Sequence, residues 1–175
     1  NDFYDWYERH DQVKALFRKQ PVDLVFIGDS ITHMFGGLPG STIIHGGPVW
    51  DKYYGGLNVV NMGFGWDRTQ NVLWRLKNGE FEGIQPKVAV LLIGTNNLVG
   101  TKNARENTPA EIAAGIEAIC DIIHTKAPDC KIILLGLLPR GQKQFAKPIK
   151  DVNTLIASFE SKGYITFVNF GLKMT

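Results

Sequence analysis

The sequence has little of what marks several large classes of protein. Its 175 residues include only two cysteines, too few for a disulfide framework or a cysteine-based metal cluster. No hydrophobic run approaches the roughly 20 residues that cross a bilayer, and no signal peptide is visible. Lysine and arginine number 19 against 17 aspartate and glutamate, without a long basic run. These absences argue against disulfide-rich, membrane-spanning and nucleic-acid-binding proteins, and they leave the compartment open between secreted, periplasmic and cytoplasmic.

The chain does have enough hydrophobic sequence for one folded unit. Residues 1–175 are 44% hydrophobic, which suits a single globular domain with a sizeable core. The two cysteines fit this core as small buried residues. Cys120 falls on the inward face of a predicted helix, and Cys130 starts the next predicted strand. A disulfide between them is a minor alternative.

The segment Val22–Phe35, which reads VDLVFIGDSITHMF, holds the first candidate site. Its first six residues have the composition of a strand that is buried on both faces of a parallel sheet. Gly28 permits a sharp turn, and the residues after it are expected to continue as a helical turn. Ser30 then lies between a strand's carboxyl end and a helix's amino end, where open α/β sheets place their chemistry. A simple helix cap formed by Asp29 and Ser30 explains the same residues equally well.

Two further predicted strands end in the same way. The strand at 57–61 runs into GFGWD at residues 63–67, and the strand at 87–93 runs into GTNN at residues 94–97. The glycine-rich turn after the first of these is a weak signal for a phosphate loop, because it lacks both the GxGxxG spacing and a following lysine.

The three turns are expected at the same edge of the sheet. In a parallel sheet, the carboxyl ends of the strands lie at one edge, so Ser30, the Gly65–Trp66 turn and Asn96 are expected to lie together. Any one of these turns is explained by a helix cap, whereas three of them argue for a site.

The rest of the chain alternates predicted helices and strands. An amphipathic helix is expected at 2–19, with His10 on the protein surface, and residues 36–54 are expected to form a long connection. Further helices are predicted at 71–76, from the capping box at Thr108 to Pro128, and at 149–159, with strands at 131–135 and 164–168. This alternation indicates right-handed βαβ units and an α/β three-layer sandwich.

Three motifs together resemble the SGNH, or GDSL-type, esterase and lipase superfamily. GDSITH at 28–33 resembles its first block, NMGFGWDRTQ at 61–70 its second and GTNN at 94–97 its third. The segment DRTQNVLWRLKNGE and the later GLLPRG are most similar to the catalytic subunits of platelet-activating-factor acetylhydrolase and to bacterial carbohydrate O-acetylesterases. The resemblance covers nearly the whole chain. It implies a flavodoxin-like sheet of five parallel strands in the order 2-1-3-4-5, with helices on both faces.

Transferred to this chain, the resemblance implies a serine esterase that works without a metal or cofactor. Ser30 is expected to attack the ester carbonyl and to carry the acyl group. The oxyanion is expected to bind the backbone N–H groups of Ser30 and Trp66 and the side-chain amide of Asn96. Four flanking residues are expected to support this site: Asp29, Gly65, Asp67 and Thr95.

One motif of the superfamily is missing. Its fifth block, Asp-x-x-His, supplies the general base and should follow the last strand, but residues 171–175 read GLKMT. A serine hydroxyl is a poor nucleophile without a base. We therefore expect that the chain lacks its C-terminal segment. His33, three residues after Ser30 on the helical turn, is a less favoured base within the chain.

The motifs leave the substrate partly open. Many members of the superfamily have glycine where this chain has Trp66, and the indole there favours a small acyl group such as acetyl. His33, Trp50 and Asn97 are further candidates for the substrate pocket. The expected partner is a small-molecule ester, either an acetylated sugar or a lipid. The sequence does not give the oligomeric state, and the resemblance to the acetylhydrolase subunits, which form dimers, leaves a homodimer as one alternative.

Two other classes of function fit parts of the sequence. An inactive member of the superfamily would bind ligand or a partner without turnover, as the missing base suggests. A flavodoxin-like nucleotide-binding protein would share the sheet topology, but this chain has no convincing phosphate loop.

Overall fold

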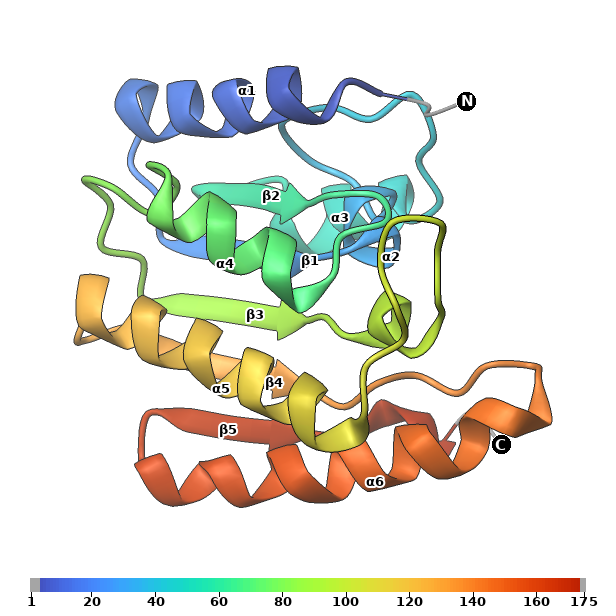
Figure 1. Cartoon of the computed structure of the whole chain (residues 1–175). Helices are drawn as coiled ribbons and strands as arrows, with labels where there is room; N and C mark the ends of the chain where they lie inside the picture. The colour runs from blue at the N-terminus through green and yellow to red at the C-terminus, as the bar shows by residue number, and fades with distance from the viewer. Residues whose placement is uncertain (1–3, 174–175) are drawn as a thin grey trace.

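Five parallel strands form one sheet in the computed structural model, which describes residues 4–173. The strands are β1 (Leu24–Gly28), β2 (Val59–Gly63), β3 (Val88–Leu92), β4 (Lys131–Leu135) and β5 (Ile165–Val168). Their order across the sheet is β2-β1-β3-β4-β5 (Figure 1). The α/β sandwich and the predicted strand order are therefore confirmed.

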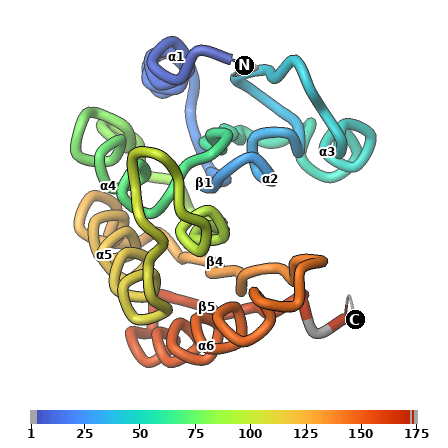
Figure 2. The backbone as a smooth tube through the Cα atoms, turned by 45° about the vertical axis from the view of Figure 1, so that its right-hand side comes forward, coloured from blue at the N-terminus to red at the C-terminus, as the bar shows by residue number. Residues whose placement is uncertain are grey.

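Six α-helices surround the sheet in the described residues. They are α1 (Trp6–Lys19), α2 (Ser30–His33), α3 (Gly47–Tyr54), α4 (Thr69–Lys77), α5 (Pro109–Lys126) and α6 (Ala146–Ala157). Four short 3-10 helices are η1 (Thr95–Leu98), η2 (Lys143–Phe145), η3 (Ser158–Lys162) and η4 (Phe170–Lys173). Helices α4, α5 and α6 cover one face of the sheet, and α3 lies on the other (Figures 1 and 2). α5 begins at the predicted capping box, in which Thr108 and Glu111 bond each other's backbone N–H groups.

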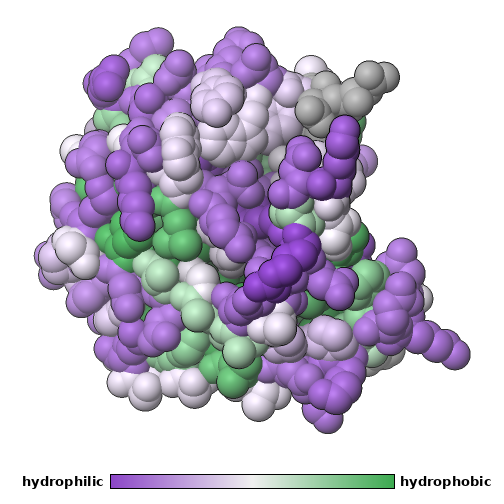
Figure 3. All heavy atoms as spheres, in the orientation of Figure 1, coloured by the Kyte–Doolittle hydropathy of each residue, from purple (hydrophilic) through white to green (hydrophobic). Residues whose placement is uncertain are grey.

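The larger hydrophobic core lies between the sheet and the α4–α6 layer. Because side chains alternate along a strand, every second residue of β3 and β4 enters this core. These residues are at most 1% exposed: Ala89, Leu91, Ile132 and Leu134. Four of the alternate residues are only half-buried: Val88, Val90, Ile133 and Leu135. In Figure 3, hydrophobic side chains reach the surface over and around α5, among mainly hydrophilic ones.

A second, smaller core lies under α3. The ring of Phe26 on β1 packs against Trp50 and Tyr54 of α3, with centroid distances of 5.3 and 5.0 Å. The expectation that residues 36–54 form only a connection is therefore wrong at its end, where Pro48 lies in the first turn of α3. Trp50, which the sequence suggests for the substrate pocket, is 4% exposed in this core.

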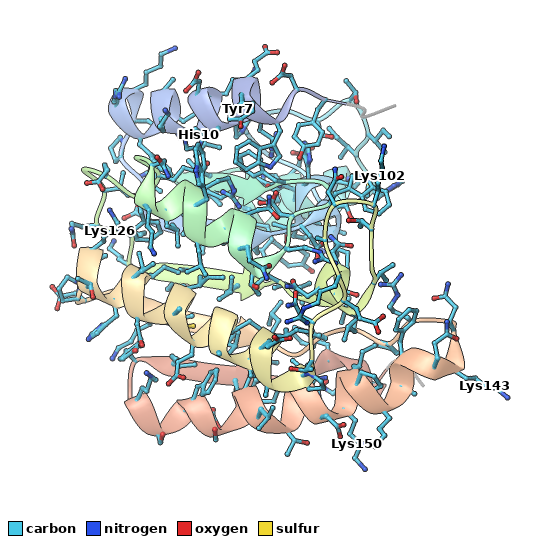
Figure 4. All side chains as sticks on the ribbon, viewed as in Figure 1. Tyr7, His10, Lys102, Lys126, Lys143 and Lys150 are labelled. Carbon is cyan, nitrogen blue, oxygen red and sulfur yellow. The ribbon has the colours of Figure 1, made fainter. Side chains whose placement is uncertain are left out.

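Helix α1 begins later than predicted and buries a histidine that was expected on the surface. Asp5 caps the helix by accepting a hydrogen bond from the Glu8 N–H, and predicted positions 2 and 3 lie outside the described residues. His10 is 4% exposed, and its Nδ1 lies 2.8 Å from Glu80 Oε1. It points from α1 toward α4 (Figure 4), because Glu80 follows α4 and offers a buried partner.

The edge of the sheet at which the strands begin carries short turns. Gly163, just before β5, has φ +77, a left-handed conformation that glycine adopts without strain, and a Cβ there would meet open space.

Cys120 and Cys130 are buried and unbridged, as predicted. Within residues 4–173, no helix is long and apolar enough to span a membrane.

Candidate active site

The first strand-end turn presents Ser30 at the start of α2. Asp29 precedes the helix and caps it, since its Oδ1 accepts a 3.0 Å hydrogen bond from the Ile31 N–H. Ser30 itself is half-buried. The helix lies directly on the end of β2, where a Cβ on Gly63 would stand 2.2 Å from the backbone nitrogen of His33. Only glycine permits this close approach, which fixes Ser30 against the second turn.

Hydrogen bonds join the three turns at one edge of the sheet. The Phe64 N–H donates to the Gly28 carbonyl at 3.0 Å, which links the second turn to the first. The Asn96 Nδ2 donates to the Asp67 carbonyl at 3.0 Å, which links the third turn to the second. Thr95 in the third turn accepts from Arg140, which follows β4. The structure therefore brings together the three turns that the sequence singled out.

Three hydrogen-bond donors at this edge suit an anionic oxygen. Within the described residues, the backbone N–H groups of Ser30 and Trp66 have no hydrogen-bond acceptor. Asn96 uses its side-chain amide nitrogen once, on the Asp67 carbonyl, so one N–H remains. These are the donors that the resemblance implies for an oxyanion. The neighbouring Gly65 N–H is already used, because it donates to His33 Nδ1 at 3.2 Å.

Asp29 is the least satisfied side chain at the site. It is 1% exposed, and its Oδ2 has no hydrogen-bond partner among the described residues. Burial raises the pKa of this carboxyl to about 6, although the bond from Ile31 opposes the rise. The carboxyl next to Ser30 therefore titrates near neutral pH instead of near pH 4.

His33 has the wrong properties for the predicted alternative base. Burial and the Arg9 charge lower the pKa of its imidazole to about 3, so it stays neutral and binds a proton poorly at neutral pH. Its Nδ1 holds the Gly65 N–H, which orients the second turn. His10 and His124 are engaged elsewhere, with Glu80 and with the ring of Tyr164.

A buried charge cluster that the sequence motifs do not predict lies behind the second turn. The Asp67 carboxylate accepts from Arg75 Nε at 2.9 Å and from Trp6 Nε1 at 2.7 Å, and Arg75 also pairs with Glu80. Arg75, Asp67 and Glu80 are each at most 1% exposed. Burial raises the pKa of Asp67 to about 6 even though Arg75 opposes the rise. The cluster fixes Asp67, whose carbonyl holds the Asn96 amide.

The sequence did contain a signal for this cluster. Arg75 occupies the face of α4 that also buries Val72 and Leu76, a position where a charged residue needs a buried partner. Glu80 follows after only a short turn, so an acid lies within reach.

Asn97, which the sequence suggests for the substrate pocket, is buried in a hydrogen-bond network. Its side chain is 0% exposed; Oδ1 accepts from the Thr69 N–H at 3.1 Å, and Nδ2 donates to Asn107 Oδ1 at 2.9 Å. It ties the start of α4 to the segment before α5. Within residues 4–173, no group of three or more histidine, cysteine or acidic side chains is arranged to hold a metal ion.

The sequence matches a known family model and curated proteins. The model for the GDSL-like lipase/acylhydrolase family matches residues 26–174. Platelet-activating factor acetylhydrolase IB subunit alpha2 from Rattus norvegicus is 39% identical over 151 residues, which is 86% of this chain. Subunit alpha1 from Bos taurus is 34% identical over 148 residues, or 85% of this chain. The aligned parts are 58% and 56% of those two proteins.

Solved structures share the fold at lower identity. An acetyl-xylooligosaccharide esterase from Geobacillus Stearmophilus has a TM-score of 0.65 at 18% identity, covering 86% of this chain and 78% of its own. AlinE4, an SGNH-hydrolase family esterase, has a TM-score of 0.62 at 20% identity, covering 89% and 79%. At these identities the likeness shows the fold alone.

Proposed function

The chain belongs to the GDSL-like lipase/acylhydrolase family, and from this premise we propose that it hydrolyses carboxylic esters with Ser30 as the nucleophile. The main support is the set of three donors beside Ser30: two backbone N–H groups without an acceptor and one free N–H of Asn96. Such preorganised donors stabilise the negative charge that develops on an ester oxygen during acyl transfer.

The proposed reaction has two steps. The Ser30 Oγ attacks the ester carbonyl carbon, and the carbonyl oxygen becomes an oxyanion held by the N–H groups of Ser30, Trp66 and Asn96. Collapse of this intermediate breaks the bond to the alcohol and leaves an acyl-serine, which water then hydrolyses. A base must accept the Ser30 proton, and with its pKa of about 3 His33 does not meet that need at neutral pH.

We propose that the acyl group is small, with acetyl as the first candidate, and that the alcohol is a carbohydrate or a lipid. Two of the similar proteins are named as acetylhydrolases, and one similar structure is of an acetyl-xylooligosaccharide esterase. A hydrolysis rate that increased steadily from acetyl to octanoyl esters of one alcohol would contradict this preference.

The test of the function compares the wild-type chain with Ser30→Ala. Hydrolysis of an aryl acetate is measured with and without added imidazole, which supplies a general base from solution. We expect wild-type turnover to rise with imidazole and the Ser30→Ala rate to fall to the level of the solution reaction, because the variant forms no acyl-enzyme. Circular dichroism confirms that both proteins are folded.

Equal rates in the two folded proteins would remove Ser30 from the mechanism. If neither protein turned over ester even with imidazole, the catalytic proposal would be wrong, and a ligand-binding role for the same site would replace it.

A further inference from the structure

Trp66 combines a strained backbone with an unpacked side chain. Its φ is +68, in the left-handed region that costs a non-glycine residue stability. One other non-glycine residue in the described part of the chain has positive φ, Phe81 at +71. Phe81 is 1% exposed, so burial of its ring offsets the strain, whereas Trp66 is 72% exposed. The fold itself therefore gives no reason for tryptophan at this position.

The indole also has no partner of its own. Within residues 4–173 it makes no ring contact, no cation–π contact and no side-chain hydrogen bond, in contrast to Trp6, Trp50 and Trp74, which all pack against other rings. The indole face is therefore free to stack on a ligand.

The neighbours of Trp66 place this exposed ring beside the candidate active site. The preceding Gly65 N–H is bonded to His33 on α2, and the carbonyl of the following Asp67 is bonded to Asn96. Trp66 thus belongs to the turn that lies between Ser30 and Asn96, and its own N–H is one of the three proposed oxyanion donors.

We propose that the Trp66 indole is a stacking platform for the alcohol part of the substrate, and that it selects a carbohydrate. This inference rests on the proposed function only for the position of the ester bond. At 72% exposure the ring is open to solvent, a position that suits the leaving group. The backbone N–H of Trp66 then serves the oxyanion and its indole serves the alcohol, in place of the acyl-side role that the sequence suggests.

The surroundings favour a sugar over a lipid chain. An indole face binds the flat C–H face of a sugar ring, and hydroxyl groups then need polar neighbours. Polar side chains of the third turn, Thr95 and Asn96, lie across from Trp66, since Asn96 bonds the Asp67 carbonyl. Ile31, 43% exposed beside Ser30, adds a single aliphatic side chain, which is too little for a long alkyl chain.

Binding of unmodified sugar tests the platform without any turnover. The probes are xylohexaose and cellohexaose, measured by isothermal titration calorimetry against wild type, Trp66→Ala, Trp66→Gly and Trp74→Ala. Trp74 is the matched control, because it is 42% exposed on α4 but packs against Trp6. We expect Kd to rise about tenfold in both Trp66 variants and to change little in Trp74→Ala.

The same variants separate stacking from strain. Trp66→Gly removes both the indole and the strained Cβ, so its Tm should rise by about 2 to 4 °C, whereas Trp66→Ala keeps the Cβ and should not gain. A Tm lowered by Trp66→Gly would show that the indole packs on protein, which would overturn the proposal.

Three other outcomes decide between this inference and the proposed function. Wild-type binding of neither sugar, or binding of dihexanoylphosphatidylcholine below its micelle concentration in place of sugar, would overturn the choice of carbohydrate. Sugar binding that depends on Trp66 in a protein without Ser30-dependent turnover would support the platform while the esterase proposal failed. Ser30-dependent esterase activity with a sugar affinity that Trp66→Ala leaves unchanged would support the esterase proposal and overturn the platform.

Discussion

At the scale of single residues, Asp29 has the clearest consequence for pH. Its pKa is about 6 in the folded protein against an ordinary value of 3.8, so between pH 4 and pH 6 the folded chain keeps a proton that the unfolded chain has lost. Stability therefore falls as pH rises through this window. Relative to Asp29→Asn, which does not titrate, wild type should lose about 2 kcal/mol of unfolding free energy between pH 4 and pH 7.

Urea unfolding of both proteins at the two pH values measures this difference. Titrating groups that do not interact with Asp29 cancel in the comparison, whereas the repulsion from Asp67, which raises the pKa of Asp29, is part of the measured difference. Parallel pH profiles for wild type and Asp29→Asn would mean that Asp29 ionises normally in the folded state.

Alanine substitutions of the adjacent residues Asn96 and Asn97 should have different effects, one on catalysis and the other on stability. Asn96→Ala removes an oxyanion donor and should lower kcat about 100-fold or more, with a small effect on stability. Asn97→Ala leaves the buried Thr69 N–H without its acceptor and should lower the unfolding free energy by about 2 kcal/mol. Aryl-acetate kinetics and urea unfolding of both variants test the pair. A large loss of stability in Asn96→Ala, with a large loss of kcat only in Asn97→Ala, would contradict these roles.

The sequence predicts residues of this site better than it predicts their contacts. Ser30, Trp66 and Asn96 were found because each follows a short apolar strand, a local pattern. The contacts of Asn97 are not predictable in this way, because no local pattern indicates that its amide oxygen accepts from the Thr69 N–H rather than from solvent. Burial of His10 depended on Glu80, 70 positions away, which no local pattern reveals.

At the scale of elements, the charge cluster couples α4 to the turn after β2. Arg75→Met should lower the unfolding free energy by about 3 to 5 kcal/mol at pH 7, because Asp67 and Glu80 would stay buried without their cation. Arg105→Met is the control, since Arg105 pairs with Glu111 at the surface and should change stability little. Equal losses measured by urea unfolding would contradict a dominant role for the buried cluster.

Element boundaries show where sequence patterns end and packing takes over. The strand predicted at 57–61 is β2 (Val59–Gly63), shifted because its pairing with β1 places Gly63 opposite Gly28. The short helix α3 was missed since its start, Gly46-Gly47-Pro48, reads locally as a turn. Burial of Trp50 against Phe26 stabilises it, and that contact is visible only in the folded chain.

At the scale of the whole molecule, the two faces of the sheet are unequally buried. Ile132 on β4 is 0% exposed against the α4–α6 layer, whereas its neighbour Ile133 is half-buried on the other face. Ile132→Ala should lower the unfolding free energy by about 3 kcal/mol and Ile133→Ala by about 1 kcal/mol. Urea denaturation of the two variants measures both values, and equal costs would mean that the second face is covered in solution.

Because the strands are parallel, the two ends of the sheet differ: one carries the candidate site and the other does not. All the candidate catalytic turns lie where strands end, while Gly163 lies just before a strand begins, and a Cβ there would meet open space. A short peptide tag or a surface linker inserted there would leave the Ser30 edge turned toward the solution. An immobilised catalyst or sensor could therefore be built on this scaffold from the opposite end, with substrate access unobstructed.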